Sequence, residues 1–285
     1  MINWKSKLLL FVKHFYIYIF LALIYIPMVL IIILSFTGQT SRGNINYGLE
    51  GDGSFENYPE LFSNNAFTNA LAGSLLLGVV TTPVVVIIAT ITCFGIWRSA
   101  TLQKQSVLLS SNLTIASPDA ITGISLMLLF TSTIVPLGVD LGFFTVILAH
   151  ISFGVPYAII AIYPRMTKLN PNTVLASYDL GSGKIRTFFK VVVPFLLPGI
   201  ISGAIIAFAM SLDDYVITNL VNGSYQTIGT AIYSTRKGIK AWVVTFGAIM
   251  VMITFVIILV KSVFIYFKSK KNAAKKITNA MEGSL

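Results

Sequence analysis

The sequence predicts an all-α, polytopic membrane protein with six transmembrane helices. Its 285 residues are 55% hydrophobic and only 11% charged. The mean hydropathy is +0.83, and the apolar residues gather in six long stretches. A soluble domain averages about 25% charged residues, so this chain lacks the polar surface that a globule in water needs. The composition excludes a soluble enzyme, a disordered protein and a free nucleic-acid binder.

Each of the six stretches is long enough to cross a bilayer, whose hydrocarbon core of about 30 Å needs roughly 20 apolar residues per helix. They comprise residues 15–36, 67–97, 106–132, 141–163, 194–217 and 241–267. The first follows Lys5, Lys7 and Lys13 and has the charge pattern of a signal peptide. Its apolar run is longer than a signal-peptide core and lacks a clear small-residue cleavage site, so we expect an uncleaved anchor.

Basic residues predict the orientation of these spans. With both termini in the cytoplasm, 16 of the 20 lysines and arginines fall on cytoplasmic segments, as the positive-inside rule requires. The expected segments are a cytoplasmic N-terminus (1–14), the first transmembrane helix (15–36), an external loop (37–66), a transmembrane domain (67–267) and a basic cytoplasmic tail (268–285). The net charge of +10 then reflects topology, with membrane lipids as its partner and no nucleic acid.

The cytoplasmic loop 164–193 carries the strongest motif. Asn170-Pro171-Asn172 is a helix-start signal, and residues 173–180 then predict a short helix. Gly181 and Gly183 provide a turn, after which 184–192 predicts a basic amphipathic helix leading to Pro194. A helix-turn-helix with exposed apolar positions indicates a docking surface for another protein, and the alternative is a solvated connector.

This loop resembles the one in permeases of ABC importers, which has the pattern E-A-A-x3-G-x9-I-x-L-P. The corresponding residues here are Leu175, Ala176, Ser177, Gly181, Val191, Val193 and Pro194. Leu175 replaces the acid and Ser177 the second alanine, while the spacing from Gly181 to Pro194 is kept. The resemblance implies a type I ABC importer permease fold for 67–267 and a coupling helix that seats on the ATPase. Asp179 lies in the same loop, and from that position we expect it to serve docking or local capping.

Four segments resemble the spermidine/putrescine subgroup of these permeases. They are SPDAITGISLMLLF at 117–130, LGFFTVILAHISFGVPYAIIAIYPRM at 141–166, ASYDLG at 176–181 and SLDDYVITNLVNG at 211–223. This resemblance implies a second permease subunit, two ATP-binding subunits and an extracytoplasmic polyamine-binding protein. ATP–Mg would bind the partner ATPase, and no cofactor is expected in this chain.

Acidic residues within or beside the spans form the candidate substrate path. Insertion of an aspartate at a helix centre costs about 2.5–3.5 kcal/mol, so each one is a functional hypothesis. Asp119 follows Pro118 inside the third predicted span, and Asp213 and Asp214 fall near the external end of the fifth. Carboxylates without a basic neighbour at their depth suit a cationic cargo. The alternatives are a Pro-linked helix cap at Asp119 and a water-solvated helix end at Asp213 and Asp214.

A polyamine fits such a path, because carboxylates bind its ammonium groups while aromatic faces contact the cation or the methylenes. Tyr157, Phe208 and Tyr215 are the aromatic candidates. Other cargoes, such as an amino acid, iron or phosphonate, remain alternatives, as does a stand-alone secondary transporter. We expect no enzyme activity, catalytic residue or metal site: the chain has one cysteine, and its two histidines, His14 and His150, lie far apart. GSGK at 181–184 lacks the P-loop's first glycine and its final Ser/Thr.

Overall fold

The computed structural model describes the backbone of residues 4–46, 55–235 and 238–282, and the side chains of 15–46, 55–235 and 238–269. The chain separates into two compact units. One comprises residues 1–64 and 235–285, and the other comprises residues 65–234. Within the described residues, extended pairing is limited to two isolated bridges, so the predicted all-α class is confirmed.

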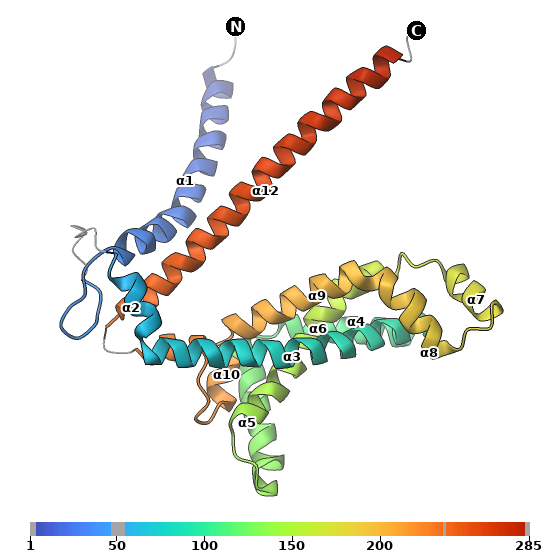
Figure 1. Cartoon of the computed structure of the whole chain (residues 1–285), viewed down its shortest axis with the longest axis horizontal. Helices are drawn as coiled ribbons and strands as arrows, with labels where there is room; N and C mark the ends of the chain where they lie inside the picture. Colours follow the sequence, from blue (N-terminus) through green and yellow to red (C-terminus); the bar gives the residue numbers. More distant parts are fainter. Residues whose placement is uncertain (1–3, 47–54, 236–237, 283–285) are drawn as a thin grey trace. The chain divides into compact units, whose positions relative to one another are not determined.

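The first unit consists of α1 (Trp4–Ser35), α2 (Asn57–Ser63) and α12 (Ala241–Glu282). α1 and α12 pack against each other where α1 ends and α12 begins, and they diverge toward the two termini (Figure 1). Gly247 makes room for their approach, since a Cβ built there would lie 2.7 Å from Ile31 Cδ1. The loop after α1 is tied down by buried Asn57, whose Nδ2 donates to the carbonyls of Ser35 and Thr37, each at 2.8 Å.

The second unit contains the remaining helices. They are α3 (Asn65–Trp97), α4 (Thr101–Ala116), α5 (Asp119–Thr133), η1 (Val135–Leu137), α6 (Phe143–Met166), α7 (Pro171–Asp179), α8 (Lys184–Thr187), the π-helical η2 (Phe188–Val192), α9 (Val193–Asp213), α10 (Val216–Val221) and α11 (Ile228–Ser234). Figure 1 shows α3, α6 and α9 packed along one another. Small residues bring α6 and α9 close, because Gly199 and Gly203 lie against Arg165 and Ile162.

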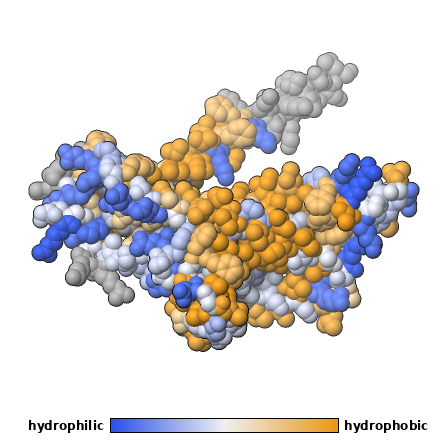
Figure 2. All heavy atoms as spheres, turned by 60° about the horizontal axis from the view of Figure 1, so that its bottom comes forward, coloured by the Kyte–Doolittle hydropathy of each residue, from blue (hydrophilic) through white to orange (hydrophobic). Residues whose placement is uncertain are grey.

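Among the residues that the structure describes, six helices are long and apolar enough to cross a membrane, as the sequence predicts. They are Phe15–Ser35, Asn65–Trp97, Asp119–Leu137, Phe143–Met166, Lys184–Asp213 and Ala241–Ser269. On the face shown in Figure 2, hydrophobic residues cover most of the second unit, and hydrophilic residues gather at the end formed by α7 and α8. An apolar surface of this kind is suited to lipid and to other membrane subunits rather than to water.

The predicted third span, 106–132, is wrong in extent. The chain breaks at Ser117 and Pro118, whose ψ values of 137° and 132° are extended, so α4 ends before them and α5 begins after them. Proline has no N–H to continue the helix and disfavours α-helical geometry in the preceding residue. Asp119 is therefore the first residue of a span rather than an interior one.

The predicted fifth span, 194–217, also differs from the structure. The helical run starts earlier, at Lys184, and ends at Asp213, because Asp214 adopts an extended conformation with ψ 126°. The loop helix predicted at 173–180 is observed as α7, Pro171–Asp179. Asn170 caps it by accepting a 3.0 Å hydrogen bond from the Asn172 N–H. The predicted helix at 184–192 is observed as α8 followed by η2.

Candidate functional site: an acidic pocket beside the end of α9

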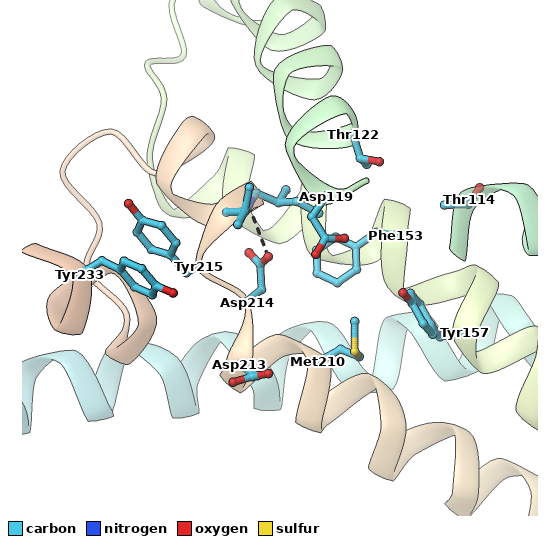
Figure 3. A pocket seen from close by; sticks show the side chains of 12 residues that line it. Thr114, Asp119, Thr122, Phe153, Tyr157, Met210, Asp213, Asp214, Tyr215 and Tyr233 are labelled. Atoms are coloured by element: carbon cyan, nitrogen blue, oxygen red, sulfur yellow. Dashed lines mark hydrogen bonds between the residues drawn. The ribbon is translucent and has the colours of Figure 1, made fainter. Parts of the chain in front are cut away.

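A cavity of about 280 Å³ lies in the second unit, beside the C-terminal end of α9. Its walls come from α4, α5, α6, α9, α10 and α11. The lining residues are Thr114, Asp119, Thr122, Phe153, Tyr157, Met210, Asp213, Asp214, Tyr215, Val216, Ile217 and Tyr233 (Figure 3). Among the residues that the structure describes, the lining holds three aspartates and no lysine or arginine.

Five of the six residues predicted for the substrate path meet in this pocket. Asp119 lies at the first turn of α5, Tyr157 on α6, and Asp213, Asp214 and Tyr215 at and after the end of α9. The sixth, Phe208, lies away from the pocket lining. Its ring packs against α3, where a Cβ built on Gly78 would lie 2.7 Å from Phe208 Cε2.

The three aspartates differ in their surroundings. Asp119 and Asp213 are exposed, and within the described part of the chain neither has a hydrogen-bond or ion-pair partner. Asp214 is partly buried and accepts hydrogen bonds from Ile217 N at 3.3 Å, Thr218 N at 2.7 Å and Thr218 Oγ1 at 2.7 Å. The Ile217 bond is the dashed line in Figure 3. Two carboxylates are thus open to a ligand, while the third also holds the start of α10.

Burial raises the pKa of the Asp214 carboxyl above its usual range, against the hydrogen bonds from Thr218 and Ile217, which lower it. Asp213 is a further, smaller cause, because its negative charge disfavours a second charge beside it. A cation placed in the pocket would stabilise the charged form of Asp214. The carboxylates and a bound cation would therefore stabilise one another.

Two stacked tyrosines form one side of the pocket. The rings of Tyr215 and Tyr233 lie 3.8 Å apart between centroids, at an interplanar angle of 10° (Figure 3). Tyr233, on α11, was not predicted, and neither were Thr114, Thr122, Phe153 and Met210. No local pattern marks Tyr233. Together the rings provide an aromatic surface beside the carboxylates, which suits a cation with an alkyl portion.

His150 is buried behind the pocket and was also missed as a candidate. Its ring nitrogens lie 3.0 Å from Ser211 Oγ and 2.9 Å from Thr218 Oγ1. It belongs to α6, an apolar span, and an ionisable residue in a span is a functional hypothesis by default. That signal was available in the sequence. Within the part of the chain that the structure describes, no group of histidine, cysteine and acidic residues is arranged to hold a metal ion.

The residues of the loop motif lie at the opposite end of the second unit's core. Leu175, Ala176, Ser177 and Asp179 are on α7, Gly181 follows it, Val191 is in η2 and Pro194 is in the first turn of α9. Gly181 adopts a φ of +78°, which turns the chain between α7 and α8. Val174 and Val192 are buried in the core cluster that α3, α6 and α9 share. The loop is therefore packed against the helices that extend toward the pocket.

The fold and the pocket together define a polytopic membrane protein with a polar, acid-lined chamber among its spans. Residues 103–269 match the family described as the binding-protein-dependent transport system inner membrane component. The chain belongs to this family, whose members are transport components of ABC importers rather than enzymes. The family resemblance identified from the loop motif is confirmed.

Curated relatives cover nearly the whole chain. It is 42% identical over 270 residues to the spermidine/putrescine transport system permease protein PotC homolog of Mycoplasma genitalium, covering 93% of this chain and 95% of that protein. It is 28% identical over 253 residues to the spermidine/putrescine transport system permease protein PotC of Escherichia coli, covering 88% and 92%.

A solved structure shares the fold. It is the crystal structure of a bacterial ABC transporter involved in the import of the acidic polysaccharide alginate. The match has a TM-score of 0.64 and 14% identity, and it covers 92% of this chain and 97% of that one. The expected permease fold is therefore confirmed by a protein that differs widely in sequence.

Proposed function

We propose that this chain forms the translocation path for polyamines, of the spermidine or putrescine type, in an ATP-driven importer. The acidic pocket carries the proposal, because three carboxylates from two separate places in the fold surround a space with an aromatic wall. Asp119 and Asp213 have no protein cation to neutralise them within the described residues. The names of the relatives, spermidine/putrescine permeases, support the same class of cargo.

The chemistry of a polyamine matches this arrangement. Its ammonium groups are separated by methylenes, so one molecule offers several cationic ends and an apolar middle. Carboxylates at Asp119 and Asp213 would bind the ammonium groups by charge-assisted hydrogen bonds. The faces of Tyr157 and the Tyr215–Tyr233 pair would contact the cation or the methylenes. An anion such as phosphonate would meet repulsion from all three aspartates.

The loop 164–193, which contains α7, is proposed as the surface that couples this path to an ATPase. Two large apolar side chains project from the part of it that precedes α8: Leu175 is 48% exposed and Leu180 is 87% exposed. Such side chains on a polar loop between spans suit a protein groove better than water. We propose a complex with a second permease subunit, two ATP-binding subunits that hold ATP–Mg, and an extracytoplasmic polyamine-binding protein.

The charge distribution supports a cytoplasmic position for α7. All seven lysines and arginines of the segment 65–234 lie at the α7 end of the second unit: Arg98, Lys104, Arg165, Lys168, Lys184, Arg186 and Lys190. Positive residues mark the cytoplasmic side of spans. The acidic pocket would then open toward the outside, where a binding protein releases its cargo, and both termini of the chain would lie in the cytoplasm.

The test is spermidine transport by the complete complex in proteoliposomes, with loaded binding protein outside and ATP inside. Wild-type complex should take up spermidine and hydrolyse ATP faster when the loaded binding protein is added. Asp119→Asn and Asp213→Asn should each lower uptake, while Asp140→Asn, an exposed aspartate outside the pocket, serves as the matched control. An assembled complex that ignores spermidine and responds to another solute would overturn the cargo assignment.

A further inference from the structure

His150 occupies an unusual position for a polar side chain in a membrane span. It lies on α6, its residue surface is 2% exposed, and the ring packs at 4.9 Å from that of Phe153. Both ring nitrogens have partners: Nδ1 is 3.0 Å from Ser211 Oγ of α9, and Nε2 is 2.9 Å from Thr218 Oγ1 of α10. The imidazole thus joins three helices through two hydroxyl groups.

The direction of these hydrogen bonds follows from counting protons. Thr218 Oγ1 has a single hydrogen, and it donates this hydrogen to Asp214 Oδ2 at 2.7 Å. Toward His150, the same oxygen can then only accept. Nε2 of His150 must carry the proton in that bond, and Nδ1 of the neutral ring accepts from Ser211. Each residue therefore donates a hydrogen bond to the next: Ser211 to His150, His150 to Thr218, and Thr218 to Asp214.

This chain of bonds ends on a carboxylate in the pocket wall. Oδ2 of Asp214 receives both the hydroxyl and the backbone N–H of Thr218, while Oδ1 accepts from Ile217 N at 3.3 Å. The direct separation between His150 Nε2 and Asp214 Oδ2 is 3.8 Å, which is too long for a hydrogen bond. Thr218 is therefore the intermediary, and His150 fixes the hydroxyl that orients Asp214.

We infer that His150 and Thr218 are positioning residues of the transport path, which set the orientation of the Asp214 carboxylate toward a polyamine. This inference rests on the proposed function. Without the His150 contact, the Thr218 hydroxyl is free to rotate, and the carboxylate loses a donor with a fixed direction. The backbone N–H of Thr218 remains, so the pocket keeps its carboxylate but with a less defined orientation.

The first test replaces the intermediary with a side chain of the same shape. Thr218→Val removes the hydroxyl and should lower spermidine uptake about 2- to 10-fold, the loss expected for one hydrogen bond. ATP hydrolysis by the assembled complex should stay unchanged, so uptake per ATP falls. A variant that is merely misfolded would lose both rates together. Thr218→Ser, which keeps the hydroxyl, should restore uptake.

The matched control is Thr245→Val. Thr245 is fully buried on α12, and among the described residues the Ala241 carbonyl of its own helix is the one partner of its hydroxyl, at 2.9 Å. This substitution should leave uptake per ATP at the wild-type value. Equal uptake per ATP in the wild type and Thr218→Val complexes, with spermidine transported by both, would overturn the positioning role while the proposed function stands.

The second test does not depend on the cargo. The full chain, carrying His14→Gln so that His150 is its single histidine, is labelled with 15N-histidine and studied by solid-state NMR in lipid bilayers. A neutral ring protonated at Nε2 supports the donor-to-acceptor direction given above for these hydrogen bonds. A changed ring signal in Thr218→Val supports the hydrogen bond between His150 and Thr218. A ring protonated at Nδ1 would overturn the inference, whether or not the complex transports spermidine.

Discussion

Ser177 Oγ and Thr187 Oγ1 lie 2.9 Å apart and join α7 to α8 by a hydrogen bond across ten residues of chain. Thr187 is fully buried, whereas Ser177 is partly buried on the inner side of α7. The position of Ser177 is one at which the family pattern has alanine. This hydrogen bond closes the turn that contains Gly181. It also joins the proposed coupling helix, α7, to the start of the helical run Lys184–Asp213.

Thr187→Val should weaken the coupling between ATP hydrolysis, which acts on the loop, and transport through the spans. The change keeps the shape of the side chain and removes one hydrogen bond, worth about 0.5–1.5 kcal/mol. We expect less spermidine transported per ATP from an assembled complex, measured in proteoliposomes. Thr173→Val, at an exposed position on α7, is the matched control. Fully additive losses in the Thr187→Val, Ser177→Ala double variant would contradict a direct pairing.

Two glycines on either side of Ser182 should respond differently to substitution. Gly181 has a φ of +78°, whereas Gly183 has a φ of −67° at the start of α8, and neither has a neighbouring atom within 4 Å of a built Cβ. Gly181→Ser should destabilise the loop by about 1–2 kcal/mol, because an L-residue is strained at positive φ. Gly183→Ser should be neutral or slightly stabilising, since serine is favoured at a helix N-cap.

Thermal unfolding of the purified complex, together with its stimulated ATPase activity, measures both glycine variants. We expect a lower midpoint and weaker stimulation for Gly181→Ser alone. Equal unfolding midpoints and equal ATPase stimulation in the two variants would contradict this prediction. They would mean that steric room or docking, rather than backbone conformation, explains the glycine at position 181.

The stack of Tyr215 and Tyr233 provides a prediction about the pocket wall. Tyr233→Leu removes a ring that lies 3.8 Å from its partner, and an aromatic pair contributes about 0.5–1.5 kcal/mol beyond its buried area. Spermidine uptake should fall roughly 2- to 10-fold, measured against the ATPase rate of the same complex. Tyr233→Phe keeps the stack and should retain most uptake. Equal loss in both variants would indicate that the hydroxyl, rather than the ring face, is required.

Local signals in the sequence predicted most of the fold. Long apolar runs identified the six spans, and the Asn170-Pro171 start with glycine after it predicted α7, because hydropathy, capping and turns depend on neighbouring residues. The break at Pro118 was considered only as part of an alternative, a Pro-linked helix cap at Asp119, and the structure confirms the break. The apolar residues on both sides made 106–132 resemble one span, and the extended conformation of Ser117 and Pro118 divides it.

The pocket was predicted only in part, because its assembly is a matter of tertiary packing. Asp119 and Asp213 were singled out for the cost of burying charge in a membrane. The two residues line one pocket because the start of α5 lies near the end of α9. The spacing of residues in the sequence does not predict that proximity. Tyr233 reaches the pocket from a seven-residue helix. Phe208, one of the three aromatic candidates, packs against α3 beside Gly78 instead.

Of two glycines on α3, Gly73 should tolerate substitution less well than Gly95. A Cβ built on Gly73 would lie 2.2 Å from the Gln226 carbonyl oxygen, whereas one on Gly95 would have no atom within 4 Å. The Gly73 carbonyl also accepts a 2.6 Å hydrogen bond from Tyr225 Oη. The segment that leads into α11 is thus docked directly on the backbone of α3.

Gly73→Ala should therefore displace that segment and with it Tyr233, lowering both the unfolding midpoint of the complex and spermidine uptake. Gly95→Ala should leave uptake unchanged and stabilise α3 by up to about 1 kcal/mol, because alanine is the better helix former. Thermal unfolding and uptake of the two variants, prepared side by side, measure the difference. A Gly73→Ala complex as stable and active as Gly95→Ala would show that the 225–228 segment adjusts freely, so that its contact with α3 does not fix the aromatic wall of the pocket.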